Sequence, residues 1–167
     1  MAYAGLMPPD DAPPPSRDVP SQLRAAAQQC ADNGTQLTAL RQEVLSLILR
    51  AEAPLTAYQL LDQLKEIRKT AMPPTVYRTL DFLIENRLIH RIERLNAFVS
   101  CTETEHNHSH RDAQFLICTK CGSVTEIEDH AITHALAKAA AARGFRPSHA
   151  IVELDGICGA CAGSAPS

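Results

Sequence analysis

The residues with the clearest chemistry are two Cys-x-x-Cys pairs, Cys118/Cys121 and Cys158/Cys161. Each pair presents two thiols on a tight turn, and together they supply the four soft ligands of a closed, tetrahedral zinc site. The 36 residues between the pairs are too many for one ribbon finger. They are enough for a small strand–helix–strand unit whose two ends the metal would join. We therefore predict a structural zinc site with four cysteine ligands.

Two disulfide bonds, or two redox-active pairs, are the alternatives for these cysteines. Disulfide bonds need an oxidising compartment, and residues 1–20 lack the basic start and apolar run of a secretory signal. Neither pair opens a helix in a βαβ context, as a thioredoxin-like motif does. No apolar run approaches the length of a membrane span. We expect a cytoplasmic protein with reduced cysteines and no membrane partner.

A second group of metal-ligating residue types surrounds a predicted β-hairpin. His90 opens the hairpin and Cys101 closes it, while Glu126 lies on the strand directly behind the first Cys pair. The loop after Cys101 offers three alternating histidines: His106, His108 and His110. One thiolate among nitrogen and oxygen ligands indicates zinc rather than a hard ion such as Mn(II). We favour His110 as the fourth ligand, with His108 as its alternative.

The alternative for this second group is that it binds no metal. The histidines would then form a solvated loop beside a buried cysteine, because free Cys often packs as a small hydrophobic residue. His130 and His134 lie one helical turn apart and could chelate a metal, but most such pairs are exposed polar positions, which we expect here. His149 is expected in the last strand, as a core residue or beside a ligand. Cys30 stands alone in the first helix, where we expect it to pack in the core.

The N-terminal half has the element order of a winged helix-turn-helix. Helices are expected from Ser21 to about residue 33, from Thr38 to before Pro54, and from a capping box at Thr56/Gln59 onward. Leu60, Leu61, Leu64 and Ile67 form the apolar stripe of the third helix. A fourth helix follows Pro73-Pro74, and residues 89–95 and 98–99 form the hairpin. In this arrangement the fourth helix enters the major groove.

The C-terminal half predicts a very small α/β unit. Strands are expected at 114–118, 124–128 and 148–155, with one helix from Asp129 to Ala142. A unit below about 80 residues usually needs an additional stabilising link, such as a bound metal ion or a subunit interface. Zinc bound by the four cysteines would be one such link, and a dimer interface would be another.

The predicted fold class is α+β, with an N-terminal winged helix-turn-helix domain followed by a small α/β dimerisation domain. The expected boundaries are a disordered, proline-rich tail at 1–20, the DNA-binding domain at 21–100, a histidine-rich hinge at 101–113, the dimerisation and structural-zinc domain at 114–162, and a tail at 163–167. The net charge is −3, yet residues 21–98 carry ten Lys/Arg against eight Asp/Glu. This excess favours the middle segment for nucleic-acid contact but is too small to establish it.

Three motifs together resemble the ferric uptake regulator (Fur) family, and its zinc uptake regulator (Zur) branch in particular. They are the run from Pro73 to Leu83, the stretch Ala57-Tyr58-Gln59-Leu60-Leu61, and Cys118-Thr119-Lys120-Cys121-Gly122 with Cys158-Gly159-Ala160-Cys161. The resemblance covers about residues 22–162. It implies a homodimer that binds double-stranded operator DNA when loaded with zinc and represses zinc-uptake genes.

The resemblance also implies residue roles. Each chain would hold two zinc ions, a structural one on the four cysteines and a regulatory one on His90, Cys101, His110 (or His108) and Glu126. The expected DNA-binding residues are Tyr58, Thr75, Tyr77 and Arg78. Arg68, Lys69, Arg91 and Arg94 are expected to meet phosphates.

Three other functions stay open at this point. One is a Fur-family sensor of iron, manganese or nickel, and another is a structural module with one zinc and no switch. The third is a zinc hydrolase with Glu126 as general base. Because the chain has no His-x-Glu or His-Glu-x-x-His motif, we expect no enzyme activity and no small-molecule substrate.

Overall fold

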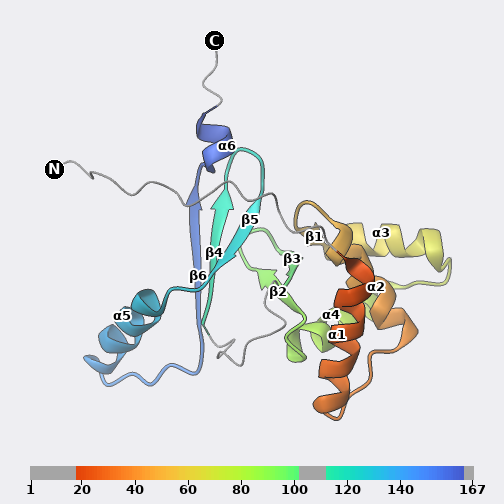
Figure 1. The fold of residues 1–167 in the computed structure, drawn as a ribbon, viewed down its shortest axis with the longest axis horizontal. Coiled ribbons are helices and arrows are strands. Elements are labelled where there is room, and N and C mark those ends of the chain that lie inside the picture. The colour runs from red at the N-terminus through yellow and green to blue at the C-terminus, as the bar shows by residue number, and fades with distance from the viewer. Residues whose placement is uncertain (1–17, 102–111, 164–167) are drawn as a thin grey trace.

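The fold consists of a helical domain with a small β-wing and a second domain built on a three-stranded sheet (Figure 1). The structure, a computed structural model, describes residues 18–101 and 112–163. The two domains lie side by side, with the wing between the helices and the second sheet. The predicted α+β class with a winged helix-turn-helix is confirmed.

The helices of the first domain follow the predicted order, with one early start. They are α1 (Val19–Asp32), α2 (Ala39–Arg50), α3 (Ala57–Ile67) and α4 (Pro73–Glu85). Asp18, not Ser21, is the N-cap of α1, because its carboxylate accepts the Ser21 N–H at 3.4 Å. The expected tail boundary at residue 20 is therefore wrong by two residues. Residues 1–17 lie outside the described part.

Helix α3 has the capping box that the sequence predicts. The Thr56 hydroxyl accepts the Gln59 N–H at 3.3 Å, and the Gln59 side chain accepts the Thr56 N–H at 2.8 Å. Leu60, Leu61 and Leu64 are buried as expected, but Ile67 is 56% exposed. The helix ends at Ile67, so no further turn of α3 shields this side chain.

A leucine-rich core holds the four helices together and makes them a rigid support for α4. Val44, Leu60, Leu64, Leu80 and Leu83 are almost completely buried there. Burial of one such side chain contributes about 1.5–3 kcal/mol. Cys30 is fully buried in the same core, as predicted for a packing residue.

The wing is a three-stranded sheet, of which the sequence predicted two strands. Strands β2 (Ile89–Ile92) and β3 (Ala97–Ser100) form the expected hairpin. β2 ends at Ile92 rather than residue 95, because residues 93–96 make the turn, with Asn96 in the left-handed region (φ 46°). The missed strand β1 (Leu55–Thr56) pairs with β3. With two residues, β1 is too short to show a strand pattern.

The second domain contains β4 (Asp112–Cys118), β5 (Val124–Ile127), α5 (His130–Ala141), β6 (Ala150–Gly156) and the short α6 (Gly159–Ala162). The strand order is β5-β4-β6, with β4 antiparallel to β5 and parallel to β6. The expected hinge at 101–113 is too long, since β4 already begins at Asp112. His149 precedes β6 and is exposed, which corrects its expected place in the strand.

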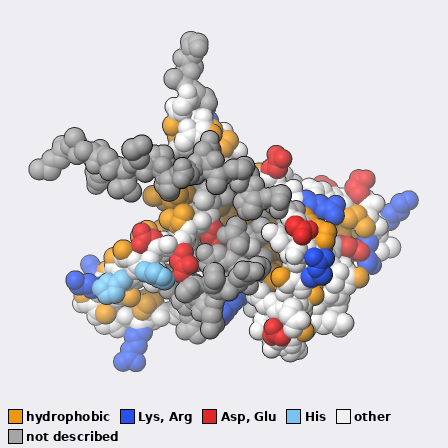
Figure 2. All heavy atoms as spheres, viewed as in Figure 1, with side chains coloured by type: hydrophobic (Ala, Val, Ile, Leu, Met, Phe, Trp, Pro, Cys, Tyr) orange, Lys and Arg blue, Asp and Glu red, His pale blue; other side chains and the backbone are white. Residues whose placement is uncertain are grey.

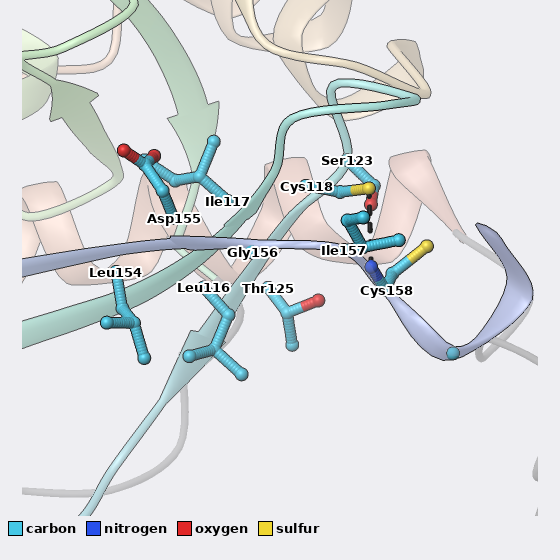
Figure 3. A pocket seen from close by; sticks show the side chains of 11 residues that line it. Leu116, Ile117, Cys118, Ser123, Thr125, Leu154, Asp155, Gly156, Ile157 and Cys158 are labelled. Atoms are coloured by element: carbon cyan, nitrogen blue, oxygen red, sulfur yellow. Dashed lines mark hydrogen bonds between the residues drawn. The ribbon is translucent and has the colours of Figure 1, made fainter. Parts of the chain in front are cut away.

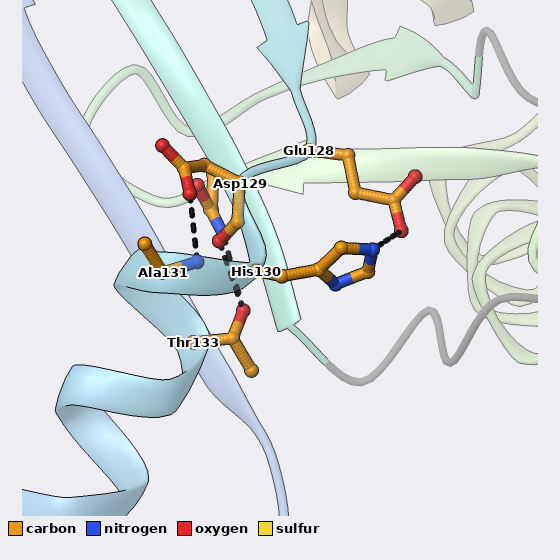
Figure 4. Close-up of polar contacts among 6 residues, drawn as sticks. Glu128, Asp129, His130, Ala131 and Thr133 are labelled. Carbon is orange, nitrogen blue, oxygen red and sulfur yellow. Dashed lines mark hydrogen bonds and ion pairs between the residues drawn. The ribbon is translucent and has the colours of Figure 1, made fainter.

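Helix α5 begins at the predicted cap, Asp129. Its carboxylate accepts the Ala131 N–H at 2.7 Å, and the Gln114 side chain donates to the Asp129 carbonyl at 2.9 Å and to Thr133 Oγ1 at 3.2 Å (Figure 4). No residue of α5 is buried within the described single chain. His130 and His134 are exposed, as predicted, and Figure 2 shows histidine side chains on the surface over this part of the molecule.

The two faces of the second sheet differ in what covers them. Phe115 and Ile117 pack against Ile92, Leu95 and Val99 of the wing, and thus join the domains. Leu116 and Leu154 leave the sheet on the opposite face, away from Ile117 and Asp155 (Figure 3), and both are exposed. None of the helices in residues 18–101 and 112–163 is long and apolar enough to cross a membrane.

Candidate metal centres

The first cysteine pair lies at the end of β4, with Cys118, and in the tight turn that leads to β5, with Cys121. The Cys118 N–H donates to the Ser123 carbonyl at 2.9 Å, and the Gly122 N–H donates to the Cys118 carbonyl at 2.9 Å. Gly122 has φ 74°, a left-handed conformation that favours glycine. The Thr119 N–H donates to the Gly156 carbonyl at 2.8 Å, which brings the turn to the end of β6.

The second pair lies on α6, directly after β6. Cys158 is the N-cap of this helix, and Cys161 lies three residues on, so both sulfurs are on one helical turn. The Cys158 N–H donates to the Cys118 sulfur at 3.3 Å (Figure 3). Because β4 and β6 are parallel neighbours, both pairs lie beyond the same edge of the sheet.

The four sulfur atoms form one cluster within the described chain. All lie within 4.8 Å of one another, and those of Cys121 and Cys158 are 3.7 Å apart. Four zinc–sulfur bonds of about 2.3 Å in a tetrahedron place sulfurs about 3.8 Å apart. The cysteines are free thiols rather than disulfides. Their geometry and donor chemistry fit a closed zinc site.

The cluster perturbs its own acid–base chemistry. N–H groups of Cys158 and Cys121 point to the Cys118 sulfur and lower its pKa to about 6. The Ser123 hydroxyl, 3.2 Å from the Cys121 sulfur, lowers the pKa of Cys121. The neighbouring cysteines raise the pKa of Cys161 to about 12, and the hydrogen bond with Cys158 has the largest effect. Without a cation, these directions favour the thiolate at Cys118 and Cys121 and the neutral thiol at Cys161. A bound cation would favour the thiolate at Cys161 as well, because metal ligands must be deprotonated. Ser123 was not predicted from the sequence, although its position two residues after Cys121 indicates a hydroxyl close to that sulfur.

The second cluster joins the wing to the second domain. His90 lies on β2 and Glu126 on β5, and Cys101 follows β3, where its N–H donates to the Leu88 carbonyl at 3.1 Å. The three ligand atoms lie within 4.8 Å of one another. The structure therefore brings together three of the four predicted ligands. His106, His108 and His110 lie outside the described residues.

This second cluster is enclosed and polar. Cys101 is buried, and the side chains of His90 and Glu126 are 13% and 16% exposed. His90 Nε2 lies 2.9 Å from Glu126 Oε1, and the His90 ring meets Phe115 edge-on at 5.3 Å. Burial lowers the pKa of His90, but hydrogen bonds to Cys101 and Glu126 and their charges outweigh this and raise the pKa to about 9. The donor set of nitrogen, thiolate and carboxylate fits zinc.

The residues expected to meet DNA lie in the first halves of α3 and α4. Tyr58 is 73% exposed at the second position of α3. Tyr77 and Arg78 are exposed on α4, and Thr75 is half-buried, while the intervening Val76 is buried in the core. The helical core thus presents the outer side of α4 to solvent, and Figure 2 shows Lys, Arg and acidic side chains mixed around this domain.

Three of the four residues expected to meet phosphates, Arg68, Arg91 and Arg94, pair with carboxylates in this structure. Arg68 forms a two-point ion pair with Glu43, with 2.9 Å between Nη2 and Oε1. This contact lowers the pKa of Glu43. Arg94 pairs with Asp155. Arg91 Nη2 lies 3.4 Å from Glu93 Oε2 and donates to Asn96 Oδ1 at 3.1 Å. Lys69 is exposed.

Comparison with known proteins places this architecture among metal-dependent regulators. The model of the ferric uptake regulator family matches residues 32–155. The zinc uptake regulation protein of Escherichia coli (strain K12) is 41% identical over 144 residues, which are 83% of this chain and 80% of that protein.

Two solved proteins have the same fold. A zinc uptake regulator complexed with zinc and DNA superposes with a TM-score of 0.83 at 35% identity, covering 87% of this chain and 96% of that one. Holo XcZur superposes at 0.78 and 41% identity, covering 86% and 99%, whereas apo XcZur, covering 87% and 98%, superposes at 0.50. The chain belongs to the ferric uptake regulator family.

Proposed function

We propose that this protein is a zinc-responsive transcriptional repressor, which binds operator DNA as a zinc-loaded homodimer in the cytoplasm and controls zinc-uptake genes. The observation that carries the proposal is the second cluster. His90 and Cys101 belong to the DNA-binding domain and Glu126 to the other domain, with their ligand atoms within 4.8 Å of one another. A metal site that joins two domains is able to set their relative orientation.

The related proteins support zinc and DNA as the partners. The Escherichia coli relative is named a zinc uptake regulation protein, and the solved regulator with a TM-score of 0.83 was complexed with zinc and DNA. These relatives favour the zinc regulator over a zinc hydrolase, and the protein is not an enzyme. Cys101 further favours zinc over iron or manganese, since thiolate is a soft ligand.

The domain arrangement supports a metal-dependent conformation. XcZur aligns at 41% identity in both of its forms, yet the TM-score is 0.78 for the holo form and 0.50 for the apo form. Because the sequence is the same, the difference reflects conformation. The present structure therefore has the domain arrangement of a metal-loaded relative.

We propose two zinc ions per chain with separate roles. Cys118, Cys121, Cys158 and Cys161 hold a structural ion that closes the small second domain. His90, Cys101, Glu126 and a loop histidine, His110 or His108, hold the regulatory one. Bound zinc would supply ligand bonds that join the wing to β5. A ligand shifts such an equilibrium only by its differential affinity for the two arrangements, and by linkage operator DNA tightens zinc binding by the same factor.

The second domain, proposed at about residues 114–162, offers the surface for a homodimer. Leu154 is 59% exposed on the sheet face opposite the wing, and Ile157, just after β6, is 60% exposed. Both line a groove of about 310 Å³. Helix α5 buries no residue in the described single chain. Exposed apolar surface of this kind marks interaction sites, and a second copy would cover it. Two copies of α4 would then meet successive major grooves.

Arg78→Ala is expected to weaken operator binding by about 1–3 kcal/mol, since an arginine on this helix reads guanine with two hydrogen bonds. The loss concerns sequence discrimination, so binding to unrelated DNA changes far less. Fluorescence anisotropy with operator and scrambled duplexes measures both. Arg146→Ala, an exposed arginine of the other domain, removes the same charge and is expected to bind normally. Equal discrimination in wild type and Arg78→Ala would refute the assignment.

The test of the function itself is zinc content measured together with operator affinity. Elemental analysis before and after a mild chelator is expected to show two zinc ions falling to one. Operator affinity, titrated against buffered zinc, is expected to fall in parallel. One zinc throughout, with zinc-independent binding, would indicate a structural module. Activation by Fe(II), Mn(II) or Ni(II) but not zinc would indicate another sensor of the family.

A further inference from the structure

The tip of the wing is held by two acidic residues of β6. Glu153 Oε1 accepts the Glu93 N–H at 2.7 Å, and Glu153 Oε2 accepts the Arg94 N–H at 3.1 Å. The Arg94 side chain also forms an ion pair with Asp155. These contacts link residues about 60 positions apart and belong to neither metal cluster. We call them the wing latch.

The chemistry of the wing turn explains why a carboxylate binds there. The last pair of the β2–β3 ladder is Ile92↔Ala97, so the N–H groups of Glu93 and Arg94 lie beyond the sheet and have no strand partner. Two successive N–H groups form a favourable site for an anion. Hydrogen bonds to an ionised acceptor are about twice as strong as neutral ones, so Glu153 satisfies both donors at once.

The placement of the latch complements that of the second cluster. β6 and β5 flank β4 on opposite sides. Glu153 and Asp155 are in register with Phe115 and Ile117, whose side chains pack against the wing. Figure 3 shows Asp155 and Ile117 on the same side of the sheet. The base of the hairpin thus meets β5 through His90 and Glu126, whereas its tip meets β6 through the latch.

Directional contacts with both β5 and β6 define the angle between the wing and the second sheet, whereas a contact with one of these strands does not. The apolar contact of Ile92, Leu95 and Val99 with the sheet is non-directional, so by itself it permits the wing to rock. The second cluster alone restrains only the base of the hairpin. With the latch also formed, the wing, and with it the packed core that carries α4, has one orientation over the second sheet.

We propose that Glu153 is a positioning residue for operator binding, which fixes the wing tip on β6 in the arrangement that the metal-loaded protein adopts. The inference rests on the proposed function and deepens it, since the metal cluster and the latch then stabilise the same domain angle. Glu153 does not touch DNA or metal in this scheme. It acts through the N–H groups of Glu93 and Arg94.

The test compares Glu153→Gln with Glu93→Gln in the full-length, zinc-loaded dimer. Glu93→Gln removes the same charge next to the latch but keeps the N–H that Glu153 binds. Amide hydrogen exchange at residues 93 and 94 is expected to accelerate in Glu153→Gln alone. Its operator affinity at saturating zinc is expected to fall about 5- to 20-fold, within the usual range of coupling between sites. Zinc per chain and melting temperature are expected to stay at wild-type values.

Faster exchange with unchanged operator affinity would overturn the proposal, because the latch would then be lost without consequence. Equal protection of these amides in the apo and zinc-loaded protein would overturn its link to the metal-loaded arrangement. If Glu153→Gln lowers the melting temperature, operator affinity is measured well below the unfolding transition of both variants. Operator affinity equal to that of Glu93→Gln under those conditions overturns the proposal. Failure of the proposed function is separate: wild-type operator binding would then ignore zinc, whatever the amides report.

Discussion

Cys121→Ser is expected to lose the structural zinc and with it the folded second domain. Residues 112–163 bury few large side chains of their own, and Phe115 and Ile117 pack against the wing rather than α5. Binding of structural zinc to small domains is worth about 10–16 kcal/mol at neutral pH, which is comparable to the whole folding stability of a typical protein, about 5–15 kcal/mol. Elemental analysis, thermal melting and size exclusion are expected to show zinc-depleted, early-melting, aggregated protein.

Ser123→Ala is the matched control for this variant. It removes the hydroxyl 3.2 Å from the Cys121 sulfur but keeps all four thiols. We expect it to retain zinc and to melt close to the wild type. Cys121→Ser protein with wild-type zinc content and melting temperature would show that the four-cysteine cluster has no structural role.

Cys101→Ser is expected to abolish the zinc response while leaving the fold intact. The four-cysteine cluster and the helical core do not include Cys101, and serine is close to cysteine in size. One zinc per chain is expected instead of two. Operator affinity at saturating zinc is expected to fall to the level of chelator-treated wild type, a loss of about 5- to 150-fold if the coupling is typical. Anisotropy titrations against buffered zinc measure it.

Cys30→Ser provides the comparison, because it makes the same thiol-to-hydroxyl change at a fully buried cysteine outside both clusters. It is expected to lower the melting temperature yet keep two zinc ions and a normal zinc response. If Cys101→Ser binds operator with wild-type zinc dependence, the regulatory role of the second cluster is wrong.

Local sequence patterns were sufficient to predict a structural feature wherever that feature depends on contacts between residues close along the chain. The Thr56/Gln59 capping box, the Asp129 cap and the two Cys-x-x-Cys turns all span at most four residues, and all formed as predicted. In the four-cysteine cluster, only the proximity of the two Cys-x-x-Cys pairs depends on the tertiary structure. The parallel pairing of β4 with β6 brings them together. The short strand β1 carried too few residues for any pattern.

The tertiary structure alone decided which partners the charged side chains contact. Arg68 and Arg94 look like phosphate-binding residues in the sequence, yet the fold gives them Glu43 and Asp155 as partners. The sequence grouped His90, Cys101 and Glu126 by topology, but only the packing of Phe115 and Ile117 on the wing brings them within reach of one ion. The wing latch has no sequence signature, because Glu153 recognises backbone N–H groups, which every residue except proline possesses. The sequence by itself therefore determined the ligand types and the local elements that carry them. The relative position of the two domains, on which a metal-dependent switch depends, follows from contacts between residues far apart in the chain.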